Sequence, residues 1–253
     1  MDLKALIFDV DGTLANTERD GHLQAFNIIF ERLGLDWYWS NELYHKLLNV
    51  TGGKERIKYY LDTYKNDFYH DDLENFIADI HRQKTDIYVE LISTGLVPLR
   101  VGVKRLIDDA SSSGLRLAIA TTTSPENVEA LIVNTLGKKY MSLFEVIGAG
   151  DVVTLKKPAG DIYNYVLNEM KIDPTQALAF EDSRNGLLSA SSAGIDSVIT
   201  VNEYTNGHNF DEALVVLDHL GDENNNFSLI KGDTTHSKFV DVEYLRELNA
   251  KNC

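Results

Sequence analysis

The chain has 253 residues, of which 43% are hydrophobic and 25% charged, so it can bury a full core in one large domain or two linked domains. A formal net charge of −15 disfavours nonspecific binding to nucleic acid or to an anionic membrane. No apolar stretch has transmembrane length, and the N-terminal apolar run is too short for a signal peptide. The single cysteine, Cys253, excludes an intrachain disulfide. We therefore expect a cytoplasmic protein without nucleic-acid or membrane partners, and a monomer is the working assumption.

The most specific motif, Asp9-Val10-Asp11-Gly12-Thr13, follows a short apolar run at residues 5–8. Alternation along an extended chain places Asp9 and Asp11 on one side, and Gly12 permits a sharp turn. Two close carboxylates repel each other unless a cation neutralises them, and Mg²⁺ favours carboxylates together with a phosphate. One aspartate can then act as nucleophile and the other as proton donor.

A plain turn and a calcium loop are the alternative interpretations of this motif. A calcium loop that starts at Asp9 would place Asp20 at its twelfth position, where a glutamate is usual. Thr13 and Ala15 would then occupy the fifth and seventh positions, so the motif fits a calcium loop poorly.

Strand-like runs recur along the chain, and helical patterns separate several of them. The spacing of Val103, Leu106, Ile107 and Ala110 is typical of a helix that buries one face. This alternation predicts an α/β fold with a doubly wound, mainly parallel sheet, whose ligands bind at the carboxyl ends of the strands. The expected strands are Leu3–Phe8, Leu115–Ala120, Phe144–Ile147, Ala177–Phe180, Ser197–Val201 and Leu214–Leu217.

Residues 16–95 lack this rhythm and are rich in aromatic and helix-compatible stretches. We predict a helical cap here, inserted into a core formed by residues 1–15 and 96–253, with hinges at Ala15–Thr17 and Ser93–Pro98. The alternative is one continuous domain with an unusually long first crossover. Residues 202–209 are expected to form a loop.

Other polar residues also follow expected strands. Thr121, with Thr122 and Thr123 after it, can bind phosphate oxygens, although such a segment is often only a helix cap. Lys157 can pair with a phosphoryl oxygen, although most surface lysines are merely solvated. The pair Glu181-Asp182 can complete a metal site, or it can simply favour a helix start.

Four elements follow one another along the chain: residues 9–13, Thr121, Lys157 and Glu181-Asp182. In this order they resemble the four motifs of the haloacid dehalogenase-like hydrolase superfamily, and Asp11 fills a position typical of its phosphatases. The resemblance implies a Rossmann-like core and a Mg²⁺ cofactor. It implies that Asp9 attacks phosphorus and forms an aspartyl-phosphate, and that Asp11 protonates the leaving group and then activates water. Thr121 and Lys157 would hold the transferring group. The implied metal ligands are Asp9, the Asp11 carbonyl and Asp182, with Glu181 in support.

Three further segments look like those of CbbY-type phosphatases of sugar phosphates, whose characterised activity removes one phosphate from xylulose 1,5-bisphosphate. They lie at residues 12–18, 50–57 and 81–85. Asn16, Val101 and Gly160 depart from the usual pattern but are not motif residues. The resemblance implies these substrate-binding residues: Glu18, Thr51, Gly52, Gly53, Lys54, Arg56, His81, Lys84, Thr122 and Thr123.

The expected function is Mg²⁺-dependent hydrolysis of a small phosphorylated sugar. Lys157 in the core and Lys54, Arg56 and Lys84 in the insert form two separated cationic sites, which favours a sugar bisphosphate. The alternatives are a β-phosphoglucomutase-like phosphotransferase and a non-catalytic protein that binds phosphosugars.

Overall fold

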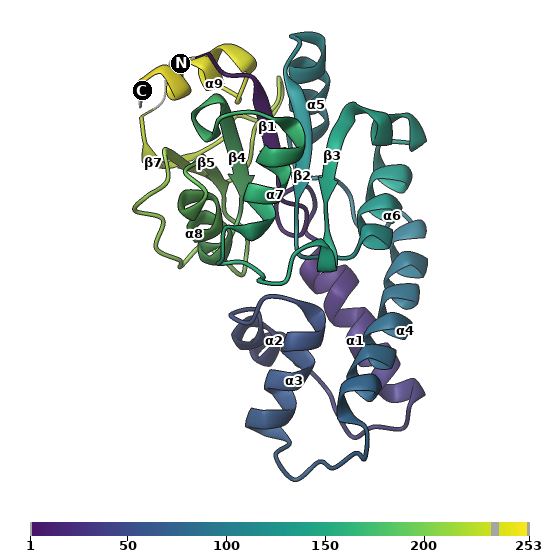
Figure 1. The fold of residues 1–253 in the computed structure, drawn as a ribbon. Helices are drawn as coiled ribbons and strands as arrows, with labels where there is room; N and C mark the ends of the chain where they lie inside the picture. Colours follow the sequence, from purple (N-terminus) through teal and green to yellow (C-terminus); the bar gives the residue numbers. More distant parts are fainter. Residues whose placement is uncertain (1, 234–237, 252–253) are drawn as a thin grey trace.

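A seven-stranded sheet forms the centre of the structure, a computed structural model that describes residues 2–233 and 238–251 (Figure 1). The strand order is β3-β2-β1-β4-β5-β6-β7. All neighbouring pairs are parallel except β6 and β7, which are antiparallel. The strands are β1 (Ala5–Phe8), β2 (Arg116–Ala120), β3 (Phe144–Gly148), β4 (Ala177–Glu181), β5 (Asp196–Thr200), β6 (Val215–Leu217) and β7 (Leu229–Gly232).

The sequence predicted strands at β1 to β6, and the doubly wound α/β fold is confirmed. Strand β7 was not predicted. It is a short edge strand whose residues are mostly exposed, so it lacks the apolar run that reveals a buried strand.

Strand β1 lies between β2 and β4, and its side chains are 0% exposed. Phe8 pairs with Ile119 on one side and with Phe180 on the other. Since the three strands are parallel, the residues that follow these positions emerge together at one edge of the sheet. The register therefore brings Asp9 close to Thr121 and Glu181.

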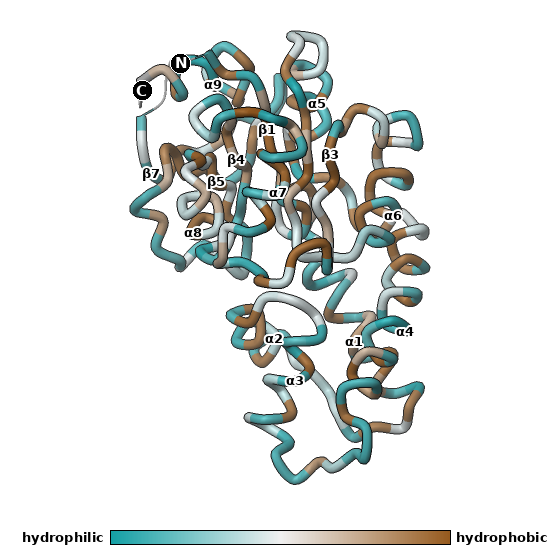
Figure 2. The backbone as a smooth tube through the Cα atoms, viewed as in Figure 1, coloured by the Kyte–Doolittle hydropathy of each residue, from teal (hydrophilic) through white to brown (hydrophobic). Residues whose placement is uncertain are grey.

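Helices cover both faces of the sheet. Leu6 and Phe8 belong to a core shared with α5, α6 and α9, whereas Ala5 and Ile7 pack in a separate core with α7 and part of α8. Figure 2 shows the hydrophobic colour concentrated along the strands and the inner sides of these helices. The helices are α5 (Val103–Ser112), α6 (Pro125–Thr135), α7 (Asp161–Met170), α8 (Arg184–Ser192) and α9 (Val242–Lys251), with short 3-10 turns at Lys138–Leu143, Gly150–Val152 and Pro174–Gln176.

The segment between β1 and α5 is helical where it has regular structure, as expected for residues 16–95, which we call the insert. Its described elements are a π-helical turn (Glu18–Leu23), α1 (Gln24–Arg32), α2 (Asn41–Leu47), α3 (Gly53–Tyr64) and α4 (Leu73–Ser93). Trp39 is 0% exposed and packs against the rings of Phe26 and Phe30. These rings and their aromatic neighbours explain why the insert is so rich in aromatic residues. Its status as a separate domain stays a prediction.

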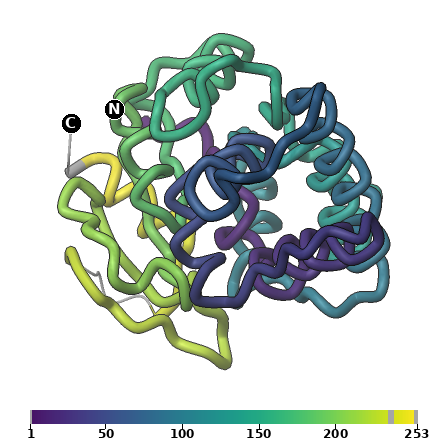
Figure 3. The backbone as a smooth tube through the Cα atoms, turned by 90° about the horizontal axis from the view of Figure 1, so that it is seen from below, coloured from purple at the N-terminus to yellow at the C-terminus, as the bar shows by residue number. Residues whose placement is uncertain are grey.

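The insert lies beyond the carboxyl ends of the strands, below the sheet in Figure 1, and in front of it when the molecule is viewed from below (Figure 3). Its two connections to the core run side by side, because Ala15 and Leu99 form an antiparallel bridge. Within the described residues, no helix combines the length and apolarity needed to cross a membrane.

Candidate active site

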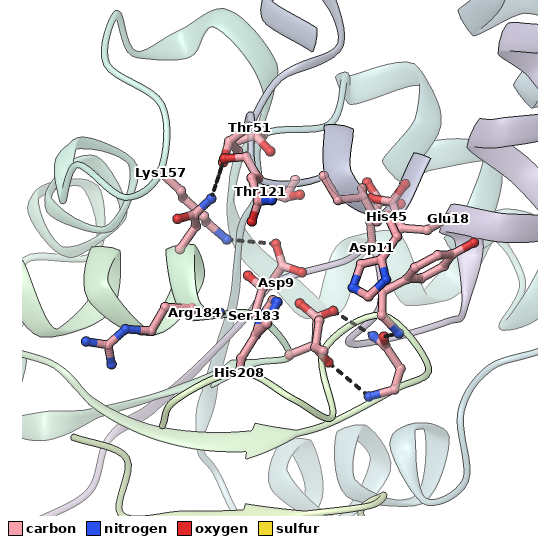
Figure 4. Close-up of a pocket in the computed structure, with 18 of the residues that line it drawn as sticks. Asp9, Asp11, Glu18, His45, Thr51, Thr121, Lys157, Ser183, Arg184 and His208 are labelled. Carbon is pink, nitrogen blue, oxygen red and sulfur yellow. Dashed lines mark hydrogen bonds and ion pairs between the residues drawn. The ribbon is translucent and has the colours of Figure 1, made fainter. Parts of the chain in front are cut away.

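A cavity of about 270 Å³ opens where the insert faces the carboxyl ends of the strands. Asp9 follows β1, Thr121 follows β2 and Asp182 follows β4, while Lys157 comes from the loop before α7. Figure 4 shows Asp9 and Asp11 near the centre of this cavity. In the same view Lys157 and Thr121 lie on one side, and Glu18 and His45 on the other.

Lys157 is the centre of the buried charges. Its Nζ donates to Asp9 Oδ1 at 2.7 Å, to Glu181 Oε1 at 2.5 Å and to the Ala120 carbonyl at 2.9 Å. The Tyr163 hydroxyl donates to the same Glu181 oxygen at 2.6 Å. The three ammonium protons therefore hold the nucleophile candidate against β2 and β4.

Burial disfavours the charged form of these carboxylates. Burial raises the pKa of Asp9 despite the Lys157 charge, and it raises the pKa of Glu181 to about 7. The pKa of Asp182 is also raised well above its ordinary value, first by burial and then by the charges of Asp9 and Glu181. Burial lowers the pKa of Lys157, but its two carboxylate partners outweigh burial and the net shift is upward. One ammonium thus faces three carboxylates that repel one another.

The same three carboxylates fit a divalent cation. Asp9, Glu181 and Asp182 each offer an oxygen, and these oxygens lie within 4.8 Å of one another. The Glu181 Oε2 atom is buried and has no hydrogen-bond partner among the described residues. A donor set made only of oxygens suits Mg²⁺, whose charge would offset the repulsion. The Asp11 carboxylate lies outside this set, and the predicted role of its carbonyl stays a prediction.

Asp11 instead faces the insert. Its Oδ1 accepts from the Thr17 hydroxyl at 2.5 Å and lies 2.9 Å from His22 Nε2. His22 Nδ1 in turn lies 2.5 Å from Lys84 Nζ. Burial alone would raise the pKa of Asp11, but His22, Thr17 and the Lys84 charge lower it below its ordinary range. The insert therefore sets the ionisation of the candidate proton donor.

A second polar group of the insert forms another part of the cavity wall. The Tyr44 hydroxyl donates to Glu18 Oε2 at 2.5 Å, and Arg56 donates to the Tyr44 oxygen at 2.9 Å. The Arg56 guanidinium is buried and lies 3.9 Å from the Glu18 carboxylate. This places a cation of the insert on the same cavity as Asp9.

The structure separates the predicted substrate residues into three groups. Those that line the main cavity are Glu18, Thr51, Arg56 and Thr122. A small adjoining cavity of about 40 Å³ is lined by Glu18, Arg56 and Thr122 again and by Gly52, Gly53, His81, Lys84 and Thr123.

Lys54 belongs to neither cavity. It lines a separate groove together with Gly52 and Gly53, where its Nζ forms a 2.6 Å ion pair with Asp151. The predicted second cationic site is therefore divided: Arg56 lines the main cavity and the small one, Lys84 lines only the small one, and Lys54 lines the groove. The roles predicted for these residues stay predictions.

Sequence reasoning missed several residues of the site. Thr17 and His22 reach Asp11, and His45 comes from α2. The expected loop at residues 202–209 folds over the cavity, and its Asn202 donates to Asp182 at 2.7 Å. The polar composition of that loop was visible in the sequence, but nothing local showed that it faces Asp182.

Comparisons with known proteins agree with this geometry. Residues 6–200 match the model of a family described as haloacid dehalogenase-like hydrolase. Protein CbbY of Rhodobacter capsulatus is 53% identical over 213 residues, which cover 84% of this chain and 92% of that protein. A crystal structure of a CbbY variant from Rhodobacter sphaeroides in complex with xylulose-(1,5)bisphosphate has a TM-score of 0.81 and 46% identity, and the match covers 86% of this chain and 94% of that one.

The fold, the buried acidic site and these relatives define an enzyme of the phosphatase class. The chain belongs to the haloacid dehalogenase-like hydrolase family. A β-phosphoglucomutase from Clostridium difficile shares the fold with a TM-score of 0.74 over 99% of this chain and 98% of that one, at 18% identity.

The buried Lys84 generates a prediction about stability and pH. Burial lowers its pKa from 10.5 to about 7, despite the charges of Asp11 and Glu18. Between these values the unfolded chain binds more protons than the folded protein, so this site makes stability rise with pH. We expect Lys84→Met to remove that rise from urea-unfolding free energies measured from pH 7 to about 10. Lys58→Met, at an exposed position of α3, should retain it. Equal pH slopes in both variants would contradict the buried, perturbed state of Lys84.

Proposed function

We propose that this phosphatase is Mg²⁺-dependent and hydrolyses a small sugar bisphosphate, such as xylulose 1,5-bisphosphate, through an aspartyl-phosphate. The observation that supports it most directly is the pair Asp9 and Asp11 on one cavity. Asp9 is held by Lys157 beside the acidic cluster, and Asp11 is held by the insert. The complex of the CbbY variant with xylulose-(1,5)bisphosphate supports the choice of substrate.

The first half-reaction transfers the phosphoryl group to Asp9. A carboxylate oxygen of Asp9 forms a bond to phosphorus while the bond between phosphorus and the sugar oxygen breaks. Asp11 must take up a proton before this step, because His22, Thr17 and Lys84 lower its pKa in this structure; it then gives that proton to the sugar oxygen and releases the sugar. In the second half-reaction Asp11 accepts a proton from water, the water oxygen attacks the phosphorus, and the bond to Asp9 breaks. Phosphate leaves and both aspartates return to their starting states.

The remaining residues stabilise charge. Lys157 offsets the charge of Asp9, and the buried Thr121 hydroxyl lies at the cavity, where it can donate to a phosphoryl oxygen. Mg²⁺, held by Asp9, Asp182 and Glu181, would supply positive charge for the transferring group.

The bisphosphate preference follows from the position of Arg56. Its guanidinium lines the same cavity as Asp9 but comes from α3 of the insert. A substrate with one phosphate at Asp9 and a second at Arg56 would join the core to the insert. Closure of the insert would also exclude water from the aspartyl-phosphate until the sugar has left.

The central test measures phosphate release from a panel of sugar mono- and bisphosphates. We expect release that requires Mg²⁺, stops with EDTA and is fastest for a bisphosphate. Asp9→Asn keeps the size of the side chain but removes the attacking charge, so its rate should fall by several orders of magnitude. Asp36→Asn, at an exposed carboxylate of the insert, is the matched control and should remain active. Conversion of a sugar 1-phosphate to a 6-phosphate, without free phosphate, would replace the proposal with a phosphotransferase.

The proton donor is tested through the leaving group. Asp11→Asn removes proton transfer, so hydrolysis of a sugar phosphate should slow by about 10²–10⁴-fold. Hydrolysis of p-nitrophenyl phosphate should slow less, because its leaving group departs without a proton. Equal losses in kcat/KM for the two substrates would remove Asp11 from the acid role.

Arg56 and Lys54 form a matched pair for the bisphosphate preference. Arg56→Ala removes the cation at the cavity and should lower kcat/KM for a bisphosphate much more than for p-nitrophenyl phosphate. Lys54→Ala removes a cation that faces Asp151 instead, so it should change the ratio of the two substrates less. If both variants slow the two substrates equally, these residues serve the fold or the closure of the insert, and the bisphosphate preference has no support.

A further inference from the structure

Arg100 lies where the chain returns from the insert to the core. Its backbone N–H donates to the Leu14 carbonyl at 2.9 Å, next to the bridge between Ala15 and Leu99. The residue is therefore fixed against the end of the motif that contains Asp9 and Asp11. Its side chain is partly buried and is absent from the lining of the main cavity.

The guanidinium of Arg100 bonds to several separate segments of backbone. One terminal nitrogen donates to the Gly12 carbonyl and to the Thr200 carbonyl, the latter at 2.8 Å. The other donates to the carbonyls of Val201 at 2.5 Å and Asp218 at 2.7 Å. A planar guanidinium can span such a set of acceptors, whereas the single ammonium of a lysine cannot.

Asn202 connects the segments held by Arg100 to Asp182. Asn202 directly follows Val201, and its Nδ2 lies 2.7 Å from Asp182 Oδ2 and 3.4 Å from the Gly12 carbonyl. Gly12 has a φ of +85°, and a Cβ on it would lie 2.1 Å from Asp182 Oδ2. Arg100 and Asn202 thus share the Gly12 carbonyl as an acceptor, in a place with no room for a side chain.

We infer that Arg100 is a positioning residue that acts through Asn202 to orient the Asp182 carboxylate toward a divalent cation. The inference rests on the proposed function for the identity of the cation. Arg100 fixes the end of β5 and the turn at Gly12. Asn202 then holds Asp182 Oδ2, in a carboxylate that offers an oxygen within 4.8 Å of oxygens of Asp9 and Glu181. Without the guanidinium, the carbonyls of Gly12, Thr200, Val201 and Asp218 each lose a donor, and the link between the end of β5 and the turn at Gly12 is weakened.

The test compares Arg100→Lys with Arg105→Lys. Arg105 is the matched control, because its guanidinium also donates to backbone carbonyls, those of Gly221 and Val240, while its side-chain partner is Asp109. Partners of metal ligands typically alter metal affinity by about 10–100-fold. Calorimetric titration with Mg²⁺ should show that Arg100→Lys binds the ion about 10–100-fold more weakly than the wild type, whereas Arg105→Lys binds it equally well. The KM for p-nitrophenyl phosphate at saturating Mg²⁺ should be nearly unchanged.

Asn202→Ala keeps the inference testable if Arg100→Lys folds poorly. It removes the bond to Asp182 directly and should weaken Mg²⁺ binding to a similar extent. The double variant should lose little more Mg²⁺ affinity than either single variant, because the two residues act in one chain of contacts.

Mg²⁺ affinity in Arg100→Lys equal to that in Arg105→Lys would make Arg100 merely structural and overturn the inference. Wild-type protein that binds no Mg²⁺ would also overturn it. Mg²⁺ binding that weakens as expected, in a wild type that releases no phosphate, would leave the inference standing and reject the proposed function.

Discussion

Repulsion between buried carboxylates is the constraint on which the site depends. The parallel register of β1 and β4 brings Asp9 beside Glu181 and Asp182, in a region where charge is poorly screened. Lys157 compensates part of this charge with two ion pairs, at 2.7 Å to Asp9 and 2.5 Å to Glu181. Removing Lys157 would leave these buried carboxylates without their cation, which is among the costliest local changes a fold can undergo. The carboxylates still exceed the single ammonium in number, and a divalent cation would offset that excess.

The insert provides the side chains that contact the Asp11 carboxylate. The strand ends place Asp9 and Thr121, but Asp11 takes its partners, Thr17 and His22, from the insert. Because those partners lower the pKa of Asp11, a movement of the insert would change the ionisation of the proton donor. The position of the insert and the acid–base state of the site are thus linked by two short contacts.

The sequence predicted what local patterns determine. Asp9, Thr121 and Glu181 follow buried apolar runs, and a parallel sheet necessarily brings such strand ends to one edge. It could not place Lys54, because the side on which a cation of α3 falls depends on how the insert folds against the core. Asn202 was missed for the same reason, since a loop sequence does not encode its neighbours, here Asp182, which precedes it by twenty positions.

The charges of the main cavity also bear on how an anionic substrate could bind. Among the described residues that line it, the cations are Lys157, Arg56 and Arg184, and each already has a carboxylate within 4.0 Å. The cavity therefore offers a phosphorylated sugar no excess positive charge of its own. Under the proposed function, the substrate and the divalent cation must each offset the charge of the other. Thermodynamic linkage then makes their affinities rise together, which allows a protein with a net charge of −15 to retain an anion.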